Sequence, residues 1–471
     1  MFAFRFARRT SLVSSRRFLL LFVVALLAIT WIGAAAGLAL AEECEPLRVG
    51  AAAVDLVADD SLVIGGSIGP GQAKGQEGKL RATAVVVQGP PNQTRLALVA
   101  CDVLMVERDI LDAACCQIQQ RTGIPFDHIL INATHTHHAP TTVTVHGYER
   151  EEGFSKQLQQ AIVDAVTQAD QQLADGDGAT VHFQLGEETT IGQNSRMLLA
   201  DGKIFWIGPH DDAVRPTGPF DPALPVLAFR NRTGALQALL FNHSTHTIGT
   251  RSPGMRSPSF YGLAAQELEE QLGGTVMFLE GASGSTHNLS LRTPEMVDRL
   301  KLAVRAALDD ATLLSNVRLA SIKREITVKI REFDEQREDE AVRTYCEKRA
   351  PERADYFISV FRDMRRQLAE RQGQTRTTWV QAMRIGDVAI VGVPGEYFTA
   401  LGMDIKRQSP FPNTIVAELA NDWVGYIPDN EAYDLGGYQV WTGLHSYVAR
   451  GTGEQIVKEA VQLLNELKQQ F

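Results

Sequence analysis

The sequence predicts an α/β protein in which mixed β-sheets are flanked by helices. First, short apolar runs rich in strand formers alternate along the chain with longer amphipathic segments, a pattern typical of sheets covered by helices. Second, the run at residues 387–393 is apolar almost throughout, as expected of a buried strand. Third, 471 residues with 44% hydrophobic side chains can bury a large core, in one large domain or two smaller ones.

The expected elements follow one another along the chain without a visible sequence repeat. Strands are predicted where a short apolar run is enriched in β-branched side chains: residues 47–56, 82–87, 96–101, 128–131, 226–229, 236–241, 275–279, 387–393 and 414–419. Helices are predicted where the segments are longer and amphipathic: residues 106–121, 153–172, 263–272, 294–311, 397–406 and 454–468.

A charge-rich segment at residues 334–374 is predicted to be a helical insertion. Apolar residues such as Tyr345, Phe357 and Phe361 interrupt its acidic and basic runs, as in solvent-exposed amphipathic helices. The pattern favours an insertion that packs on the domain over a lid or a membrane-facing element.

The N-terminal residues 1–41 have the composition of an export signal. They contain five arginines and no acid, and an apolar run ends in Ala-Leu-Ala before Glu42. We therefore expect a periplasmic or secreted protein whose mature part is a single hydrolase domain, residues 42–471. An uncleaved membrane anchor is the alternative, because the apolar run is long enough to span a bilayer.

Charge and cysteine content exclude two other classes of protein. The formal net charge is −10, and the N-terminal segment contributes only basic groups, so a nucleic-acid partner is not expected. The 5 cysteines are odd in number and lack the paired spacing of a zinc ribbon or a disulfide framework. One disulfide remains compatible with an oxidising compartment.

Histidines gather just after two of the predicted strands. The chain has 11 histidines, and six of them fall in or near two loops, at positions 135, 137, 138, 146, 243 and 246. Neutral imidazole is a common zinc ligand, and on an extended segment His135 and His137 would share a face while His138 points away. The loops therefore predict a metal site, with hydrogen-bonded core imidazoles as the alternative.

Two further candidate ligands, Glu396 and Tyr426, also follow strand-like runs. Loops at the carboxyl ends of strands converge in α/β proteins, so residues distant in sequence can meet there. Taken alone, Glu396 could be an acid at a helix N-terminus and Tyr426 an ordinary half-buried tyrosine. The glycine-rich residues 65–71 lack the ending of a phosphate loop and are expected to form a tight surface loop.

Together these segments resemble the catalytic domain of the neutral, non-lysosomal ceramidases, from about Val49 to the C-terminus. The Thr-His-Thr-His-His-Ala-Pro run at residues 134–140 is similar to the family motif whose first histidine binds zinc, which implies that role for His135. The resemblance implies three further ligands for one zinc ion per chain: His246, with His243 as the competing position, Glu396 and Tyr426.

The same resemblance implies the catalytic groups. Tyr438 resembles a tyrosine that binds the developing oxyanion, and Arg196 resembles an arginine near the scissile group, with the spacing off by one. Zinc lowers the pKa of a bound water to about 7, which would activate it to attack an amide carbonyl. His137 would pass a proton to the leaving amine or support the ligands.

The loop at residues 281–288 departs from the family. His287 stands where the family has a serine that is important for activity, and Ser285 stands where it has an aspartate. Ser285 is kept as a candidate catalytic residue, and His287 could join the zinc site. The expected function is hydrolysis of an amide bond in an N-acyl, ceramide-like small molecule or lipid, with peripheral membrane contact. A zinc esterase or phosphoesterase, and a non-catalytic exported binding protein, are the alternatives.

Overall fold

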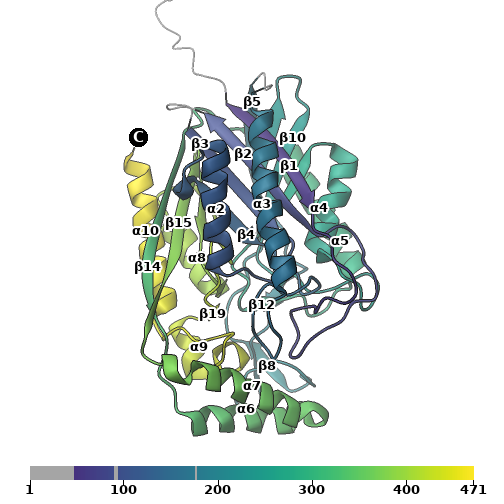
Figure 1. The fold of residues 1–471 in the computed structure, drawn as a ribbon, viewed down its shortest axis with the longest axis vertical. Helices are drawn as coiled ribbons and strands as arrows, with labels where there is room; N and C mark the ends of the chain where they lie inside the picture. The colour runs from purple at the N-terminus through teal and green to yellow at the C-terminus, as the bar shows by residue number, and fades with distance from the viewer. Residues whose placement is uncertain (1–46, 90–93, 175–177, 471) are drawn as a thin grey trace, which may run out of the picture. The chain divides into compact units, whose positions relative to one another are not determined.

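The fold is built from three mixed β-sheets with helices on their outer faces (Figure 1). The computed structural model describes residues 47–89, 94–174 and 178–470. The predicted export segment lies outside these residues. Among the described residues, no helix is both long and apolar enough to cross a membrane.

Each large sheet contains four strands that follow the same pattern: two antiparallel pairings and then one parallel pairing. The first sheet is β1 (Arg48–Asp55), β2 (Arg81–Gly89), β3 (Thr94–Cys101) and β4 (Ile129–Ala133). The second is β5 (Ala179–Glu187), β9 (Ala223–Asn231), β10 (Leu236–His243) and β11 (Thr275–Glu280), with β13 (Thr312–Leu313) added at the β5 edge. The third is β14 (Leu319–Lys329), β15 (Thr375–Ile385), β16 (Val388–Gly392) and β18 (Asn413–Ala417).

The helices repeat with the strands. A helix joins the two parallel strands of each sheet: α2 (Arg108–Thr122), α4 (Ser259–Leu272) and α8 (Thr399–Gln408). A second helix follows the last strand: α3 (Glu152–Gln172), α5 (Thr293–Asp309) and α10 (Thr452–Gln469). The chain is therefore three copies of one β-β-β-α-β-α unit. The expectation of no repeat holds for the sequence but is wrong for the fold. The three units have the same order of strands and helices, but the side chains at equivalent positions differ.

The three sheets share one apolar core. Leu98 of β3, Leu240 of β10 and Ile390 of β16 are fully buried and belong to the same cluster of packed side chains. The opposite faces carry the helices; α3, for example, lies over β1 and β2. Strands β5, β14 and β15 were not predicted.

The first connection of each unit is a long excursion rather than a tight hairpin. These connections span residues 56–80, 188–222 and 330–374, and they leave their sheets at the end where the parallel strands finish. The second contains β6 (Gln193–Asn194), β7 (Met197–Leu199) and β8 (Ala213–Pro216), and the third contains α6 (Glu335–Arg349) and α7 (Ala354–Leu368). The segment predicted as a helical insertion is thus the third unit's version of a shared feature.

The insertion packs on the domain through aromatic side chains. The N-cap Asp334 accepts a hydrogen bond from the backbone of Arg337, which starts α6 at the expected place. On α7, Phe357 and Phe361 are buried in the same cluster as Tyr438 and Trp441 from the C-terminal loops. The helices therefore rest against the loops that follow β18.

Candidate metal centre

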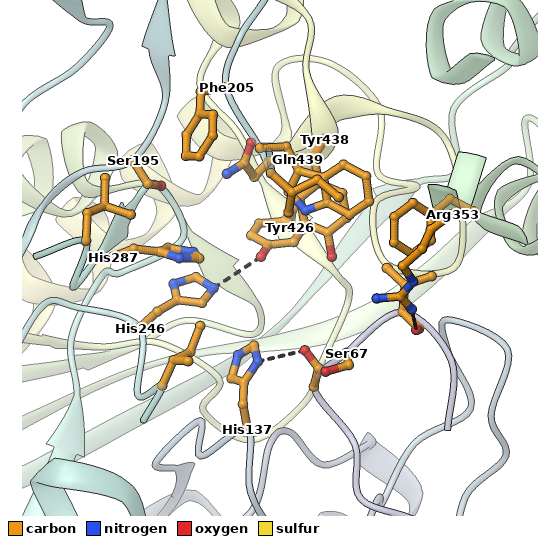
Figure 2. A pocket seen from close by; sticks show the side chains of 17 residues that line it. Ser67, His137, Ser195, Phe205, His246, His287, Arg353, Tyr426, Tyr438 and Gln439 are labelled. Atoms are coloured by element: carbon orange, nitrogen blue, oxygen red, sulfur yellow. Dashed lines mark hydrogen bonds between the residues drawn. The ribbon is translucent and has the colours of Figure 1, made fainter. Parts of the chain in front are cut away.

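A cavity of about 330 Å³ lies among the loops at the carboxyl ends of the parallel strands (Figure 2). All three excursions contribute to its wall: Gly66 comes from the first, Trp206 from the second and Phe357 from the third. His137, His246 and Tyr426 also line it, from loops that follow β4, β10 and β18.

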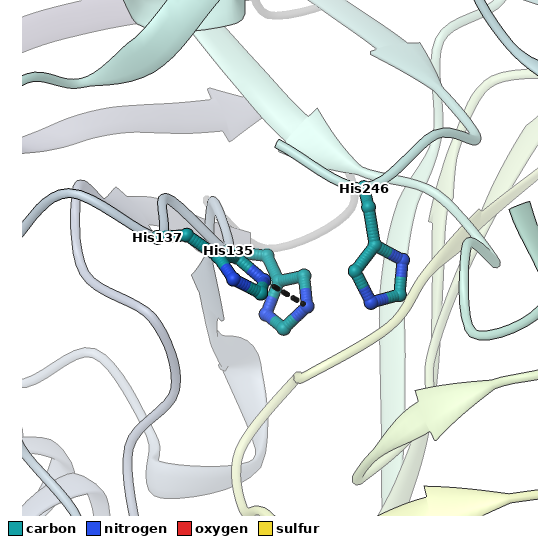
Figure 3. A group of neighbouring side chains, drawn as sticks. All are labelled: His135, His137 and His246. Atoms are coloured by element: carbon teal, nitrogen blue, oxygen red, sulfur yellow. Dashed lines mark hydrogen bonds between the residues drawn. The ribbon is translucent and has the colours of Figure 1, made fainter. Parts of the chain in front are cut away.

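Three imidazoles meet at this cavity (Figure 3). The Nε2 atoms of His135 and His137 are 3.3 Å apart, and the ring centres of His135 and His246 are 4.5 Å apart. One nitrogen from each of the three rings lies within 4.8 Å of the others. His135, His137 and His246 could therefore hold a metal ion.

Backbone carbonyls orient all three rings. Nδ1 of His135 lies 2.9 Å from the Leu104 oxygen, Nδ1 of His137 lies 2.8 Å from the Gly66 oxygen, and Nδ1 of His246 lies 2.9 Å from the Ser283 oxygen. A carbonyl only accepts, so each Nδ1 carries the hydrogen and each Nε2 presents a lone pair. Lone pairs that face one another at these distances repel, and a cation bound between them would remove that repulsion.

Glu396 and Tyr426 complete the group. Glu396 lies in β17 (Glu396–Tyr397), which pairs in parallel with β19 (Tyr426–Ile427) so that the two ligand candidates are direct partners. Oε2 of Glu396 is 3.5 Å from Nε2 of both His135 and His246, and the Tyr426 hydroxyl is 3.1 Å from Nε2 of His246. Glu396 is not at a helix N-terminus, because α8 begins at Thr399.

These separations match a tetrahedral zinc site. With metal–ligand bonds of about 2.0–2.1 Å, neighbouring ligand atoms in a tetrahedron lie ~3.3 Å apart. The structure brings together His135, His246, Glu396 and Tyr426, and adds His137 beside His135. The donor set is nitrogen and oxygen, which suits Zn²⁺.

Burial keeps His135 neutral, and the neighbouring side chains keep Glu396 charged. Burial and the neighbouring His246 lower the pKa of His135 to about 4. Burial would raise the pKa of Glu396, but His246, His135 and Tyr426 together hold it below its usual value. At neutral pH the group therefore presents lone pairs and one negative charge, as a divalent cation requires.

The chain turns sharply at the first ligand. His135 has a φ of 61°, in the left-handed region, so the extended conformation expected for residues 135–137 is wrong. The turn follows β4 directly, where the Thr134 amide donates to the Cys101 carbonyl at 2.9 Å. It is this turn, rather than strand alternation, that brings His135 and His137 to one point.

Two histidines of the same loops do not belong to the group. His243 is fully buried, and its Nδ1 lies 2.5 Å from the Tyr261 hydroxyl and its Nε2 3.1 Å from the Glu188 carbonyl, so both nitrogens are occupied. His138 points away, as expected, and its Nε2 accepts from the Gly249 amide at 2.9 Å. His246 is therefore the histidine that reaches the centre.

Tyr438 stands in an aromatic wall beside the centre. Its ring stacks on Trp206 with the ring centres 4.7 Å apart and the planes 3° from parallel. Its hydroxyl lies 3.1 Å from Nε2 of His146, and its carbonyl lies 3.2 Å from Nε2 of His445. Its ring centre is 5.7 Å from that of Tyr426, so Tyr438 is a neighbour of the ligand group.

Arg196 and Ser285 lie outside the ligand group, and neither lines the cavity. Arg196 is buried and donates to Gln439 Oε1 at 2.8 Å and to the Gly436 carbonyl at 2.7 Å, which fixes the loop before Tyr438. The Ser285 hydroxyl bonds Thr399 at the start of α8, at 3.1 Å. Their catalytic roles remain predictions.

His287 lies directly against the ligand group. Its ring is stacked on that of His246, with the ring centres 4.1 Å apart, and it lines the cavity. Nε2 of His287 is buried and has no hydrogen-bond partner among the described residues.

Sequence reasoning missed several residues of the cavity. Gly66 is not part of a plain surface loop, because its carbonyl orients His137. The glycine run was the available signal, since glycine permits close backbone approach. Trp206, Arg353 and Phe357 lie in the second and third excursions, and no motif marks them.

Comparisons with known proteins establish the type of fold. No protein-family model matches the sequence, and neither does any curated protein. Among solved structures, the chain is similar to neutral ceramidase from Pseudomonas aeruginosa, with a TM-score of 0.70 and 18% identity over 90% of this chain and 75% of that chain. It is also similar to a ceramidase complexed with C2, with a TM-score of 0.67 and 17% identity over 90% of this chain and 76% of that chain. The chain has a ceramidase-like fold.

Proposed function

We propose that this protein is a zinc-dependent hydrolase that cleaves the amide bond of an N-acyl compound, and that His135, His246, Glu396 and Tyr426 hold the zinc. The observation that carries the proposal is the convergence of lone pairs and one carboxylate on a single point beside a cavity. The ceramidase-like fold supports the choice of an amide bond. Bound zinc would lower the pKa of a bound water and would act as a Lewis acid toward the carbonyl oxygen.

Tyr438 is the proposed oxyanion donor. Burial, with Glu396 next, raises the pKa of its hydroxyl well above the usual value, so the group keeps its proton at neutral pH. When the hydroxyl turns toward the carbonyl oxygen of a substrate, its own oxygen can accept from Nε2 of His146. Removing one such donor typically lowers kcat by about 10²–10³-fold.

His137 is the proposed proton carrier. Its Nδ1–H is bound to the Gly66 carbonyl, so Nε2, which lies 3.3 Å from Nε2 of His135, presents the lone pair that accepts a proton and passes it to the leaving amine. Burial lowers the pKa of His137 well below the usual value, so the ring starts neutral. The nitrogen that would take the proton is therefore unprotonated at neutral pH.

The test is hydrolysis of N-acyl compounds by purified protein with measured zinc content. We expect fatty acid release that a chelator abolishes and zinc restores. Zinc-loaded protein that cleaves ester or phosphate probes but no amide would show a different hydrolase. Protein that is folded but free of metal, and inactive on all probes, would favour a binding role.

The proposed location is outside the cytoplasm, on the basis of the N-terminal composition. Cell fractionation tests it, and N-terminal sequencing of the exported protein tests cleavage before Glu42. Retention in the membrane fraction with an intact N-terminus would indicate an anchor.

A further inference from the structure

The cavity is lined by both apolar and polar side chains. Phe205, Ile248 and Leu289 are among the apolar side chains that line it, and Ser67 and Arg353 are among the polar ones. In Figure 2, Arg353 stands across the cavity from Ser195 and His287, with His246 and Tyr426 between them. A substrate whose amide lies at the imidazoles would therefore reach apolar side chains and the Arg353 guanidinium.

Arg353 is the only lysine or arginine that lines the cavity among the described residues. Its guanidinium lies 4.4 Å from the ring centre of Phe357, and Nη2 donates to the Ile68 carbonyl at 3.3 Å. The second contact links the third excursion to the first, and together the two contacts hold the cation at the cavity.

The positive charge of Arg353 has no acidic partner at this place. No ion pair joins it to a carboxylate of the described residues, and no aspartate or glutamate lines the cavity beside it. The neighbouring Glu352 and Asp355 are exposed and do not line the cavity.

We propose that the substrate carries an anionic oxygen group on its amine part, a carboxylate or a phosphate, and that Arg353 selects it. The acyl chain packs on apolar lining residues such as Phe205, Ile248 and Leu289, and the guanidinium binds the anion through charge-assisted hydrogen bonds. This inference rests on the proposed amide hydrolysis and adds the class of amine.

The test compares three N-acyl compounds of equal chain length: N-octanoylglycine, N-octanoylethanolamine and the phosphate ester of the latter. Wild-type protein should show kcat/KM about tenfold higher for at least one anionic compound than for the neutral one. Arg353→Gln should lower kcat/KM for the anionic compound to about that of the neutral compound and so abolish the preference. The control is Arg366→Gln on α7, which is exposed, pairs with Asp363 at 2.8 Å and does not line the cavity.

Equilibrium binding separates this inference from the proposed function. Calorimetry with the same compounds and variants measures selection by charge whether or not the amide is cleaved. Preferential binding of an anionic compound that Arg353→Gln removes, without hydrolysis, would uphold charge selection and contradict the hydrolase. Equal use of neutral and anionic compounds, no binding of the anionic ones, or an unchanged preference in Arg353→Gln would overturn the inference while leaving amide hydrolysis intact. The compound preferred distinguishes carboxylate from phosphate.

Discussion

Two groups of buried histidines lie beside the same cavity and are held in different ways. In the ligand group, His135, His137 and His246 bind backbone carbonyls through Nδ1 and turn Nε2 toward one another. In the aromatic wall, His146 and His445 each contact Tyr438 through Nε2, and their Nδ1 atoms are buried without a partner among the described residues. The first group is arranged to hold an ion, and the second to hold a tyrosine.

The difference teaches that metal binding and turnover should be separable. The ligand rings are aimed by the backbone, so the loss of one ring removes a donor from the ion. The wall rings are held by stacking and by Tyr438, so changes there should alter the reaction while the metal stays bound. Substitutions in the two regions should therefore fall into two classes.

The largest effect is expected in the ligand group. His246→Ala should abolish amide hydrolysis, by at least about 10³-fold, because it removes a metal donor that also contacts Glu396 and Tyr426. The measurement is kcat/KM with circular dichroism to confirm the fold. His182→Ala on β5, outside the cavity, is the control and should keep full activity. If the His246→Ala protein stayed active, the ligand group would not be needed for turnover, and the distinction between the ligand group and the aromatic wall would fail.

Tyr438→Phe should give the next largest effect. The ring and its stack on Trp206 remain, but the hydroxyl is lost, so kcat should fall about 10²-fold while zinc content is unchanged. Steady-state kinetics and elemental analysis of the same sample provide the check. Loss of zinc in this variant would place Tyr438 in the ligand group instead.

Gly66→Ala should slow turnover by displacing His137, which is not one of the four proposed zinc ligands. A Cβ at this position would lie 2.6 Å from Cβ of His137, and the residue has a φ of +108°. We expect about a tenfold loss of kcat with zinc still bound, because His137 must move. The matched control is Gly202→Ala, which has a φ of +79° and open space around it. Equal losses in both variants would mean that backbone strain, and not the displaced imidazole, is the cause.

The smallest effect is a change in acid stability from His146. Burial lowers its pKa from 6.5 to about 4, so between these pH values the unfolded chain takes up a proton that the folded protein does not. Stability therefore falls as the pH drops through this window, by up to about 3 kcal/mol for this residue. In His146→Gln, the loss of unfolding free energy between pH 7 and pH 4 should be smaller by that amount. Between pH 7 and pH 8 the unfolding free energies of the two proteins should change in parallel. If the variant lost as much unfolding free energy as the wild type between pH 7 and pH 4, the lowered pKa of His146 would be contradicted.

The sequence predicted the buried elements well because their apolar runs are dense. It missed β5 and β14, whose outer positions carry polar residues such as His182, Lys323 and Arg324. Their strand character depends on burial of only one face and on their partners in the sheet. The threefold repeat could not be seen in the sequence, because what repeats is the order of the elements and the pairing of the strands, and not the side chains.

The ligand group was predictable because each donor follows a strand, whereas the aromatic wall was largely not. Tyr438 was found only through resemblance, and its contacts with Trp206 and His146 bring together residues from distant parts of the chain. Arg196 and Ser285 show the limit of motif matching. Both were assigned through the resemblance, yet their side chains bond to neighbouring loops and do not line the cavity.

The most direct test of the central claim is the metal content of the purified protein and of four single variants: His135→Ala, His246→Ala, Glu396→Gln and Tyr426→Phe. We predict one zinc per chain in the wild type and a lower zinc affinity in every variant, with the fold retained. A folded wild-type protein that binds no zinc, or zinc binding that Glu396→Gln leaves unchanged, would contradict the account.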